Sequence, residues 1–175
     1  MAFWIRTHTR AASGLLLVCV IALSCGRWPP VVTNVEDVAA LPAGEKRIRC
    51  IGCGDEALAA IGRRLQDLDY LFINNDARIT DVGIQAISTL RHLRQLEVGS
   101  AAGLTDASIT AINQLTALEE LSIENASEIS SGAFQSLGAS TRLRRLFLIR
   151  CKNASAQTTQ ILRQRLPGAD VRVIE

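Results

Sequence analysis

A pattern that returns at a constant interval limits the possible folds of this chain more than any other feature. Four segments share the form L-x-x-L-x-[LIV], namely LDYLFI, LRQLEV, LEELSI and LRRLFL. Their first residues are equally spaced along the chain at Leu68, Leu93, Leu118 and Leu143. A fixed period of about 25 residues is typical of solenoids, in which one unit cannot bury its apolar side and stacked neighbours create the core.

Each unit is predicted to contain a short strand and then a helix. Strand side chains alternate between two faces, so Leu71 and Ile73 should point into the core from the strand that begins at Tyr70. Thr80-Asp81 and its counterparts precede the next apolar run, and Thr, Asp and Ser favour the start of a helix. Behind these residues, apolar side chains recur at helical spacing: Ile84, Ile87 and Leu90, then Ile109, Ile112 and Leu115, then Phe134 and Leu137.

The repeat continues toward both ends of the chain. Residues 48–53 fit the strand half of an earlier unit, with Ile48 and Cys50 pointing inward, and a last strand is expected at about 170–174. We therefore predict an α/β solenoid over 45–175, with about five units plus the terminal strand. This short horseshoe would carry parallel strands on its concave face and helices on its convex face.

The repeat resembles a known family, the cysteine-containing class of leucine-rich repeats. Its pattern is L-x-x-L-x-L-x-x-C-x-x-I-T-D-x-G-L, and ITDVGI (79–84) and LTDASI (104–109) are similar to the second half. This RNI-like class is best known from F-box-type ubiquitin-ligase receptors and also occurs in many bacterial proteins. The resemblance covers roughly 48–174 and implies a surface that binds another protein. The family's cysteine is matched by Cys151 and, with a shifted alignment, by Cys53, whereas Asp76, Ala101 and Ala126 replace it elsewhere.

The segment 1–25 is predicted to be an export signal. Arg6 and Arg10 give a basic start, and the uncharged run at 14–23 has the length of a signal peptide. Ser24-Cys25 after this run resembles the lipobox of bacterial lipoproteins, which implies lipidation of Cys25 and attachment to the cell envelope. A simple cleaved signal, an uncleaved anchor and a mitochondrial presequence are the alternatives, and the last fits the absence of acidic residues before Glu36.

Residues 26–44 are predicted to form a tether and an N-terminal cap. Trp28, Pro29 and Pro30 suit a short tether. The segment 33–36, Thr-Asn-Val-Glu, matches a capping box, and we expect a helix at about 35–41 that covers the exposed end of the first repeat.

Charge and reactive side chains exclude several functions. Arg6 and Arg10 are the only charged residues before Cys25, so the remaining chain carries 17 basic and 17 acidic residues. This neutral body argues against nucleic acid as a partner, because that binding needs a concentrated basic surface. Outside the leader, His92 is the only histidine, and no G-x-S-x-G element is present. We therefore expect neither an enzyme nor a protein that holds a cofactor.

Cys50 and Cys53 form a C-x-x-C at inward repeat positions. Three interpretations remain open, namely buried thiols, a local disulfide, and a redox or metal pair. No second C-x-x-C or histidine pair is present to complete a zinc site, so we expect no metal. Export would favour the disulfide, because the compartment outside the cytosol is oxidising.

The outward strand positions are the candidate binding residues. Neighbouring strands lie about 4.8 Å apart, so these positions form a continuous panel, which we expect to be basic at its ends, acidic in its middle and to expose aromatic rings. Exposed aromatics beside charges suit a protein-binding face. The plainer interpretation is that Glu120 pairs with Arg145 and the rings merely cover the sheet. The candidates are Arg47, Arg49, Tyr70, Phe72, Glu97, Glu120, Arg145 and Phe147, with Arg172 on the last strand.

The sequence thus predicts a monomeric, non-enzymatic module that is exported, anchored to a membrane through its N-terminus, and binds a protein through its concave sheet. Two other classes are considered. One is an intracellular adaptor of the ubiquitin-ligase type, which the short segment between Cys25 and Ile48 disfavours, since an F-box domain does not fit there. The other is a mitochondrial assembly factor for a respiratory complex or ATP synthase. The chain resembles the small leucine-rich-repeat proteins associated with those complexes.

Overall fold

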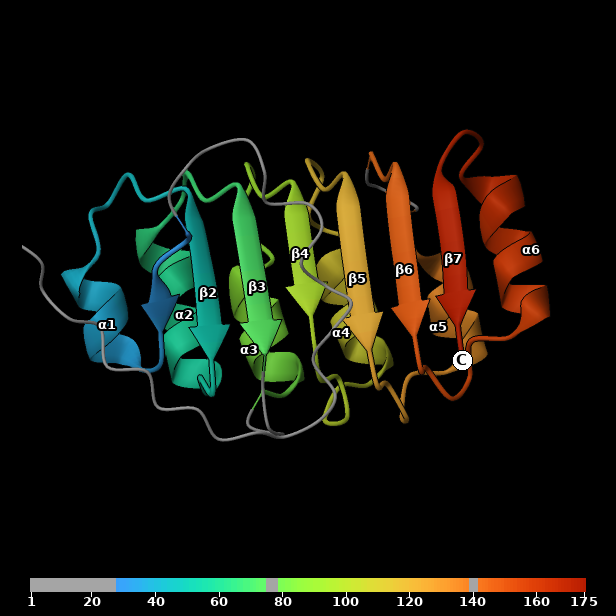
Figure 1. Cartoon of the computed structure of the whole chain (residues 1–175), viewed down its shortest axis with the longest axis horizontal. Coiled ribbons are helices and arrows are strands. Elements are labelled where there is room, and N and C mark those ends of the chain that lie inside the picture. The colour runs from blue at the N-terminus through green and yellow to red at the C-terminus, as the bar shows by residue number, and fades with distance from the viewer. Residues whose placement is uncertain (1–27, 75–78, 139–141) are drawn as a thin grey trace, which may run out of the picture.

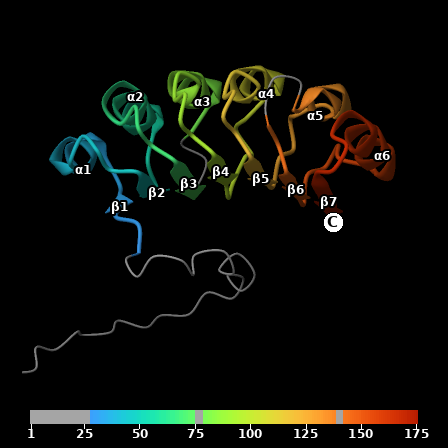
Figure 2. The same cartoon turned by 90° about the horizontal axis from the view of Figure 1, so that it is seen from above.

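The repeated units form a single curved solenoid. The computed structural model describes residues 28–74, 79–138 and 142–175, and in these residues seven strands alternate with six helices. All seven strands belong to one parallel sheet whose spatial order, β1 to β7, is the order of the chain (Figure 1). Figure 2 shows the strands along the inner side of an arc and the helices along its outer side. The predicted α/β repeat architecture is therefore confirmed.

The strand positions follow the period of the sequence. The last strand falls at the predicted residues, and five of the six helices in the described residues begin directly behind a polar N-cap residue. The strands are β1 (Val31–Val32), β2 (Arg47–Ile51), β3 (Tyr70–Asn74), β4 (Gln95–Val98), β5 (Glu120–Glu124), β6 (Arg145–Ile149) and β7 (Asp170–Ile174). The helices are α1 (Val35–Ala40), α2 (Asp55–Arg64), α3 (Asp81–Ile87), α4 (Asp106–Ile112), α5 (Ser131–Ser136) and α6 (Ala156–Arg165).

The core lies between the sheet and the helices. Alternate residues of β2 to β6 are buried. The register places equivalent residues of successive units side by side, so that Leu71 pairs with Leu96 and Leu96 with Leu121. The predicted inward residues Ile48 and Cys50 are both 0% exposed. The helices contribute the other layer of the core from the apolar positions expected from their spacing, which include Ile84, Ile87, Ile109, Ile112 and Phe134.

A ladder of aspartates connects the starts of successive helices. Thr80 is the N-cap of α3, and its N–H and Oγ1 donate to the carboxylate of Asp55, the first residue of α2, at 2.9 and 2.6 Å. Thr105 donates to Asp81 in the same way at 2.9 and 2.6 Å. Each unit therefore fixes the helix start of the next one, in addition to the capping that each Thr provides within its own helix.

The ladder has a further step and then stops. Ser130 donates to the carboxylate of Asp106 at 2.7 Å through both its N–H and its Oγ. Ser131 occupies the next aspartate position and has no carboxylate to offer. Asp81 also accepts from Ser108, and although burial raises the pKa of Asp81, the hydrogen bonds from Ser108 and Thr105 outweigh it, so that this pKa lies below 3.8. The step of the ladder at Asp81 thus depends on an ionised carboxylate.

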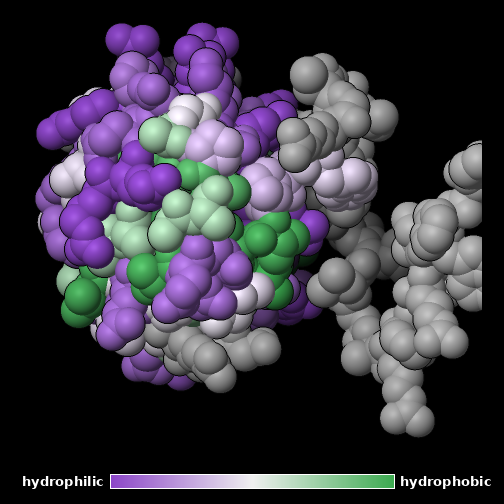
Figure 3. Space-filling model, turned by 90° about the vertical axis from the view of Figure 1, so that its left-hand side faces the viewer, coloured by the Kyte–Doolittle hydropathy of each residue, from purple (hydrophilic) through white to green (hydrophobic). Residues whose placement is uncertain are grey.

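The N-terminal cap contains a strand that the sequence did not predict. Strand β1 pairs with β2 in parallel, with Val32 beside Cys50, and extends the sheet beyond the first repeat. Helix α1 then packs beside α2, as expected for a cap. Figure 3 looks onto this end and shows apolar side chains among polar ones, and Val31 of β1 remains 49% exposed.

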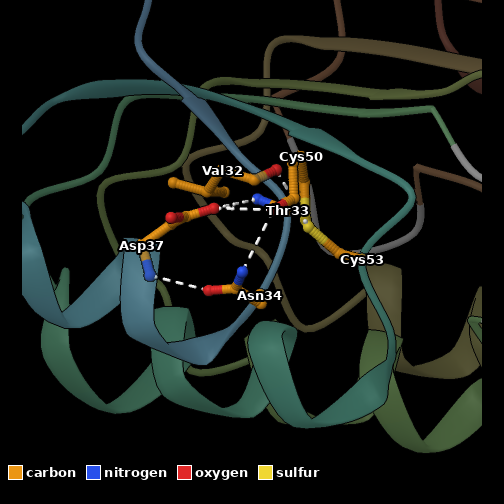
Figure 4. The surroundings of a disulfide bond; sticks show 6 residues. All are labelled: Val32, Thr33, Asn34, Asp37, Cys50 and Cys53. Carbon is orange, nitrogen blue, oxygen red and sulfur yellow. Dashed lines mark hydrogen bonds between the residues drawn. A yellow bond between two sulfur atoms is a disulfide. The ribbon is translucent and has the colours of Figure 1, made fainter.

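The predicted capping box is shifted by one residue. Asn34, and not Thr33, is the N-cap of α1, and its side chain accepts from the Asp37 N–H at 2.9 Å. The Asp37 carboxylate accepts from the N–H and Oγ1 of Thr33 at 2.8 and 2.7 Å, and these bonds lower its pKa (Figure 4). Glu36, which the prediction placed in the box, is therefore not the reciprocal acceptor. The reciprocal bond is therefore made by Asp37 to Thr33, one residue before the N-cap.

Cys50 and Cys53 form a disulfide beneath this cap. Their Cα atoms are 5.7 Å apart, both residues are 0% exposed, and the Cys53 Sγ lies 3.3 Å from the carbonyl oxygen of Val32 in β1 (Figure 4). The bridge connects β2 to the turn that leads into α2. Cys151, at the equivalent position of a later unit, is a buried free thiol whose pKa is raised by burial. The structure thus contains the disulfide among the three interpretations left open by the sequence.

Candidate protein-binding face

The outward residues of the strands form two long rows on the concave face. The parallel register aligns them across the sheet because each unit contributes the same strand positions. All eight candidate residues from the sequence lie in these rows. The first row is Arg47, Tyr70, Gln95, Glu120, Arg145 and Asp170, and the second is Arg49, Phe72, Glu97, Ser122, Phe147 and Arg172.

The N-terminal part of the face consists of arginines stacked on aromatic rings. The guanidinium carbon of Arg47 lies 4.9 Å from the centre of the Tyr70 ring, and that of Arg49 lies 5.4 Å from the centre of the Phe72 ring. Arg49 also lies 6.0 Å from the Trp28 ring, which comes from the tether. The rings of Tyr70 and Phe72 are half-buried. We expected exposed rings, and the difference arises because the long arginine side chains lie across them.

Glu97 adds a carboxylate beside this cluster. It follows Phe72 in the second row, and burial raises its pKa, with a further rise from the charge of Glu124. The Tyr70 hydroxyl and the charges of Arg49 and Arg47 oppose this rise without cancelling it. Burial and the neighbouring Glu97 raise the pKa of Tyr70 in turn. The Tyr70 hydroxyl therefore stays protonated near neutral pH and remains a hydrogen-bond donor.

The C-terminal part of the face is neutralised by ion pairs. Arg145 pairs across the strands with Glu120, as the plainer interpretation of the sequence proposed. Arg172 lies 5.8 Å from the centre of the Phe147 ring and forms an ion pair of 2.8 Å with Asp170 on its own strand. The expectation of two basic ends is therefore wrong for this end, because each of its arginines faces a carboxylate.

Arg47 and Arg49 differ from these arginines in their partners. Within the residues that the structure describes, neither guanidinium group forms an ion pair or a hydrogen bond, although the backbone N–H of Arg47 donates to the Glu45 carboxylate at 3.4 Å. The Nε atom of Arg47 is buried and has no hydrogen-bond partner there. The unbalanced positive charge of the concave face is thus concentrated on β2.

Sequence reasoning missed two contributors to this face. Trp28 belongs to the tether, where no period indicates a contact with Arg49. Asp170 was assigned to the last strand, but its pairing with Arg172 was not foreseen. A general signal was available for Asp170, since residues i and i+2 of a strand share one face.

Other surfaces offer less for recognition. Two shallow hollows lie beside the helices, one of about 550 Å³ between α6 and β7 and one of about 220 Å³ between α1 and α2. No group of three or more His, Cys, Asp or Glu side chains in the described ranges is arranged to hold a metal ion. Over the same ranges, no helix is long and apolar enough to cross a membrane. Cys25, the predicted lipidation site, lies outside the described residues.

Comparison with protein-family models and with curated proteins finds no match to this chain.

Proposed function

We propose that this chain is a non-enzymatic leucine-rich-repeat module that binds a protein partner through its concave sheet. The observation that carries the proposal is the two-row panel of aromatic and arginine side chains on that sheet. Tyrosine, tryptophan and arginine are the residue types that carry most binding energy at protein interfaces, and phenylalanine offers similar area. A parallel sheet also presents these residues at regular spacing, which suits an extended contact.

The proposal includes export and attachment to an envelope membrane through Cys25. The basic start, the apolar run at 14–23 and Ser24-Cys25 support it, since they match the order of a lipoprotein signal. The buried Cys50–Cys53 disulfide is compatible with it, because disulfides persist in oxidising compartments.

Affinity capture from envelope extract tests the binding face. The bait variant Phe72→Ala/Phe147→Ala removes two rings from separate parts of the panel, and a protein captured by the wild type should be lost or strongly reduced. Gln85→Ala/Thr110→Ala on the exposed side of α3 and α4 is the matched control and should retain capture. Retention by a well-folded ring variant would place the binding site elsewhere, and no specific capture by the wild type would contradict the proposal.

A further inference from the structure

The arginines of the concave face fall into two groups according to their contacts. Arg145 pairs with Glu120, Arg172 with Asp170, and Arg150, just beyond β6, with Glu124 at 3.6 Å. Arg47 and Arg49 are the exceptions, since their guanidinium groups contact aromatic rings and no carboxylate of the described chain. Among the described residues, the face therefore has a neutralised half and a half with two free cations. These cations stand on one strand, two residues apart, and so share one face of the sheet.

The rings hold both guanidinium groups in place without using their hydrogen-bonding capacity. A ring face attracts a guanidinium group through its π-electrons, and the planar group stacks on it. Arg47 over Tyr70 at 4.9 Å and Arg49 over Phe72 at 5.4 Å both have this arrangement. Apart from the buried Nε of Arg47, the N–H donors at the edge of each guanidinium group remain available for a ligand. A restrained side chain also loses less entropy when it binds one.

We propose that the Arg47–Arg49 pair and its rings bind an acidic polypeptide segment of the partner. In this complex, aspartate or glutamate side chains accept hydrogen bonds from the two guanidinium groups, and apolar side chains between them lie against the parts of the Tyr70 and Phe72 rings that the arginines leave exposed. Charge complementarity selects this occupant, because the two cations have no counter-charge in direct contact within the described chain. The inference rests on the proposed protein-binding function and adds the chemistry of the partner.

Carboxylate fits this subsite better than phosphate does. Glu97 lies beside the pair in the register, so the cluster of two arginines and one glutamate has a formal charge of one, not two. The body of the chain is neutral, with no broad basic field to attract a polyanion. A singly charged carboxylate therefore gains the contacts of the arginines with less repulsion from Glu97 than a doubly charged phosphate would meet.

Fluorescence anisotropy with a defined peptide tests the inference. The probe is a fluorescein-labelled eight-residue peptide with four glutamates, two leucines and two serines, titrated with the full chain in mild detergent. The wild type should bind it saturably and should not bind the same peptide with glutamine for glutamate. Arg47→Gln/Arg49→Gln should weaken binding by about tenfold or more, because charge-assisted hydrogen bonds are lost.

Arg94→Gln/Arg144→Gln is the control, since it removes the same total charge from two arginines that lie outside the two rows and face Asp69 and Glu119. Its binding should stay within about twofold of the wild type, because these arginines are already paired. Equal weakening by both variants would overturn the inference by showing a long-range charge effect. Absence of binding to the glutamate peptide, or displacement of the peptide by inorganic phosphate at a lower concentration than by free glutamate, would also overturn it.

The same variants separate this inference from the proposed function. If the captured envelope protein depends on Phe72 and Phe147 but is retained by the well-folded Arg47→Gln/Arg49→Gln variant, the concave face binds a protein and the acidic-segment inference is wrong. If capture does not depend on the rings either, the proposed function itself is wrong. Circular dichroism of each variant verifies that the solenoid remains folded.

Discussion

Single side chains of this solenoid have sharply different roles even when they are neighbours in the sequence. Leu121 is 1% exposed in the core between β5 and the helices, whereas Glu120 faces the concave side and pairs with Arg145. We expect Leu121→Ala to lower the free energy of unfolding by about 2–5 kcal/mol through lost burial and a cavity. Glu120→Ala should lower it by at most about 1 kcal/mol, since the pair is partly exposed. Chemical denaturation measures both changes, and equal losses would contradict the strand register.

Asp81 gives the aspartate ladder a dependence on pH. Its pKa in the folded chain lies below 3.8, so its carboxylate stabilises the fold at pH values above the unfolded pKa. This stabilisation is lost as the pH falls through the lower, folded pKa. Asp81→Asn should therefore lower the melting temperature at pH 7 and should reduce the difference in stability between pH 7 and pH 3. Asp67→Asn, at an exposed position, is the control and should change neither quantity. If the melting temperature of Asp81→Asn changed with pH in the same way as that of the wild type, the role of Asp81 in the ladder would be contradicted.

The close spacing of helices α2 and α3 depends on the glycine at position 62. A Cβ atom at Gly62 of α2 would overlap with the carbonyl oxygen of Ala86 in α3, so the two helix backbones meet directly. Gly62→Ala should therefore destabilise the chain by about 1–3 kcal/mol, because the helices must move apart. The measurement is denaturant unfolding of the full chain.

Gly132 of α5 provides the matched control for this element. A Cβ atom there would lie no closer than 3.8 Å to Ser130 Oγ, in ordinary contact. Gly132→Ala should raise stability by about 0.4–1 kcal/mol, because alanine reduces the freedom of the unfolded chain. If Gly62→Ala and Gly132→Ala lower the free energy of unfolding equally, the loss at Gly62 does not come from the spacing of the helices.

Apart from the cap helix α1, which its capping residues indicated, the elements that the sequence predicted are those that share the period. Leucine columns, Thr or Ser caps and the strand at 170–174 recur at fixed spacing, so each unit confirms the assignment of the next. Strand β1 has only two residues, too few to show an alternation of apolar and polar side chains. It also lies outside the 25-residue period, so the repeat could not predict it either. The cap at Asn34 was placed one residue early because Thr33 and Asn34 are both good caps and only the geometry of Asp37 distinguishes them.

The position of the candidate binding face could be predicted from the sequence, but the contacts of each arginine on it could not. Alternation identified which residues point outward, and register suggested that Glu120 meets Arg145. Which arginine stacks on a ring and which meets a carboxylate depends on long, flexible side chains that reach several neighbours. The sequence therefore located Arg49 and Arg172 on one row but did not distinguish the free cation from the paired one.

For the molecule as a whole, the main prediction concerns its attachment to a membrane. We expect cleavage behind Ser24 and diacylation or triacylation of Cys25, because two acyl chains give stable membrane attachment whereas one is marginal. Mass spectrometry of the N-terminal peptide from the membrane fraction should show the lipid mass. Cys25→Ser should move the chain out of that fraction. An unmodified Cys25, or release of wild type and Cys25→Ser alike into the soluble fraction, would contradict the anchor.

The strands follow one another in the sheet in the same order as in the chain, and this order determines how the molecule would respond to a pulling force. Each strand has hydrogen-bonded neighbours only from the units directly before and after it, so among the described residues no distant segment holds the C-terminal unit in place. Tension applied to the C-terminus would peel units away in sequence, each releasing roughly 80–90 Å of extended chain. The disulfide stands in the first unit, at the opposite end, and the short stretch that it closes between Cys50 and Cys53 would not extend even if that unit opened.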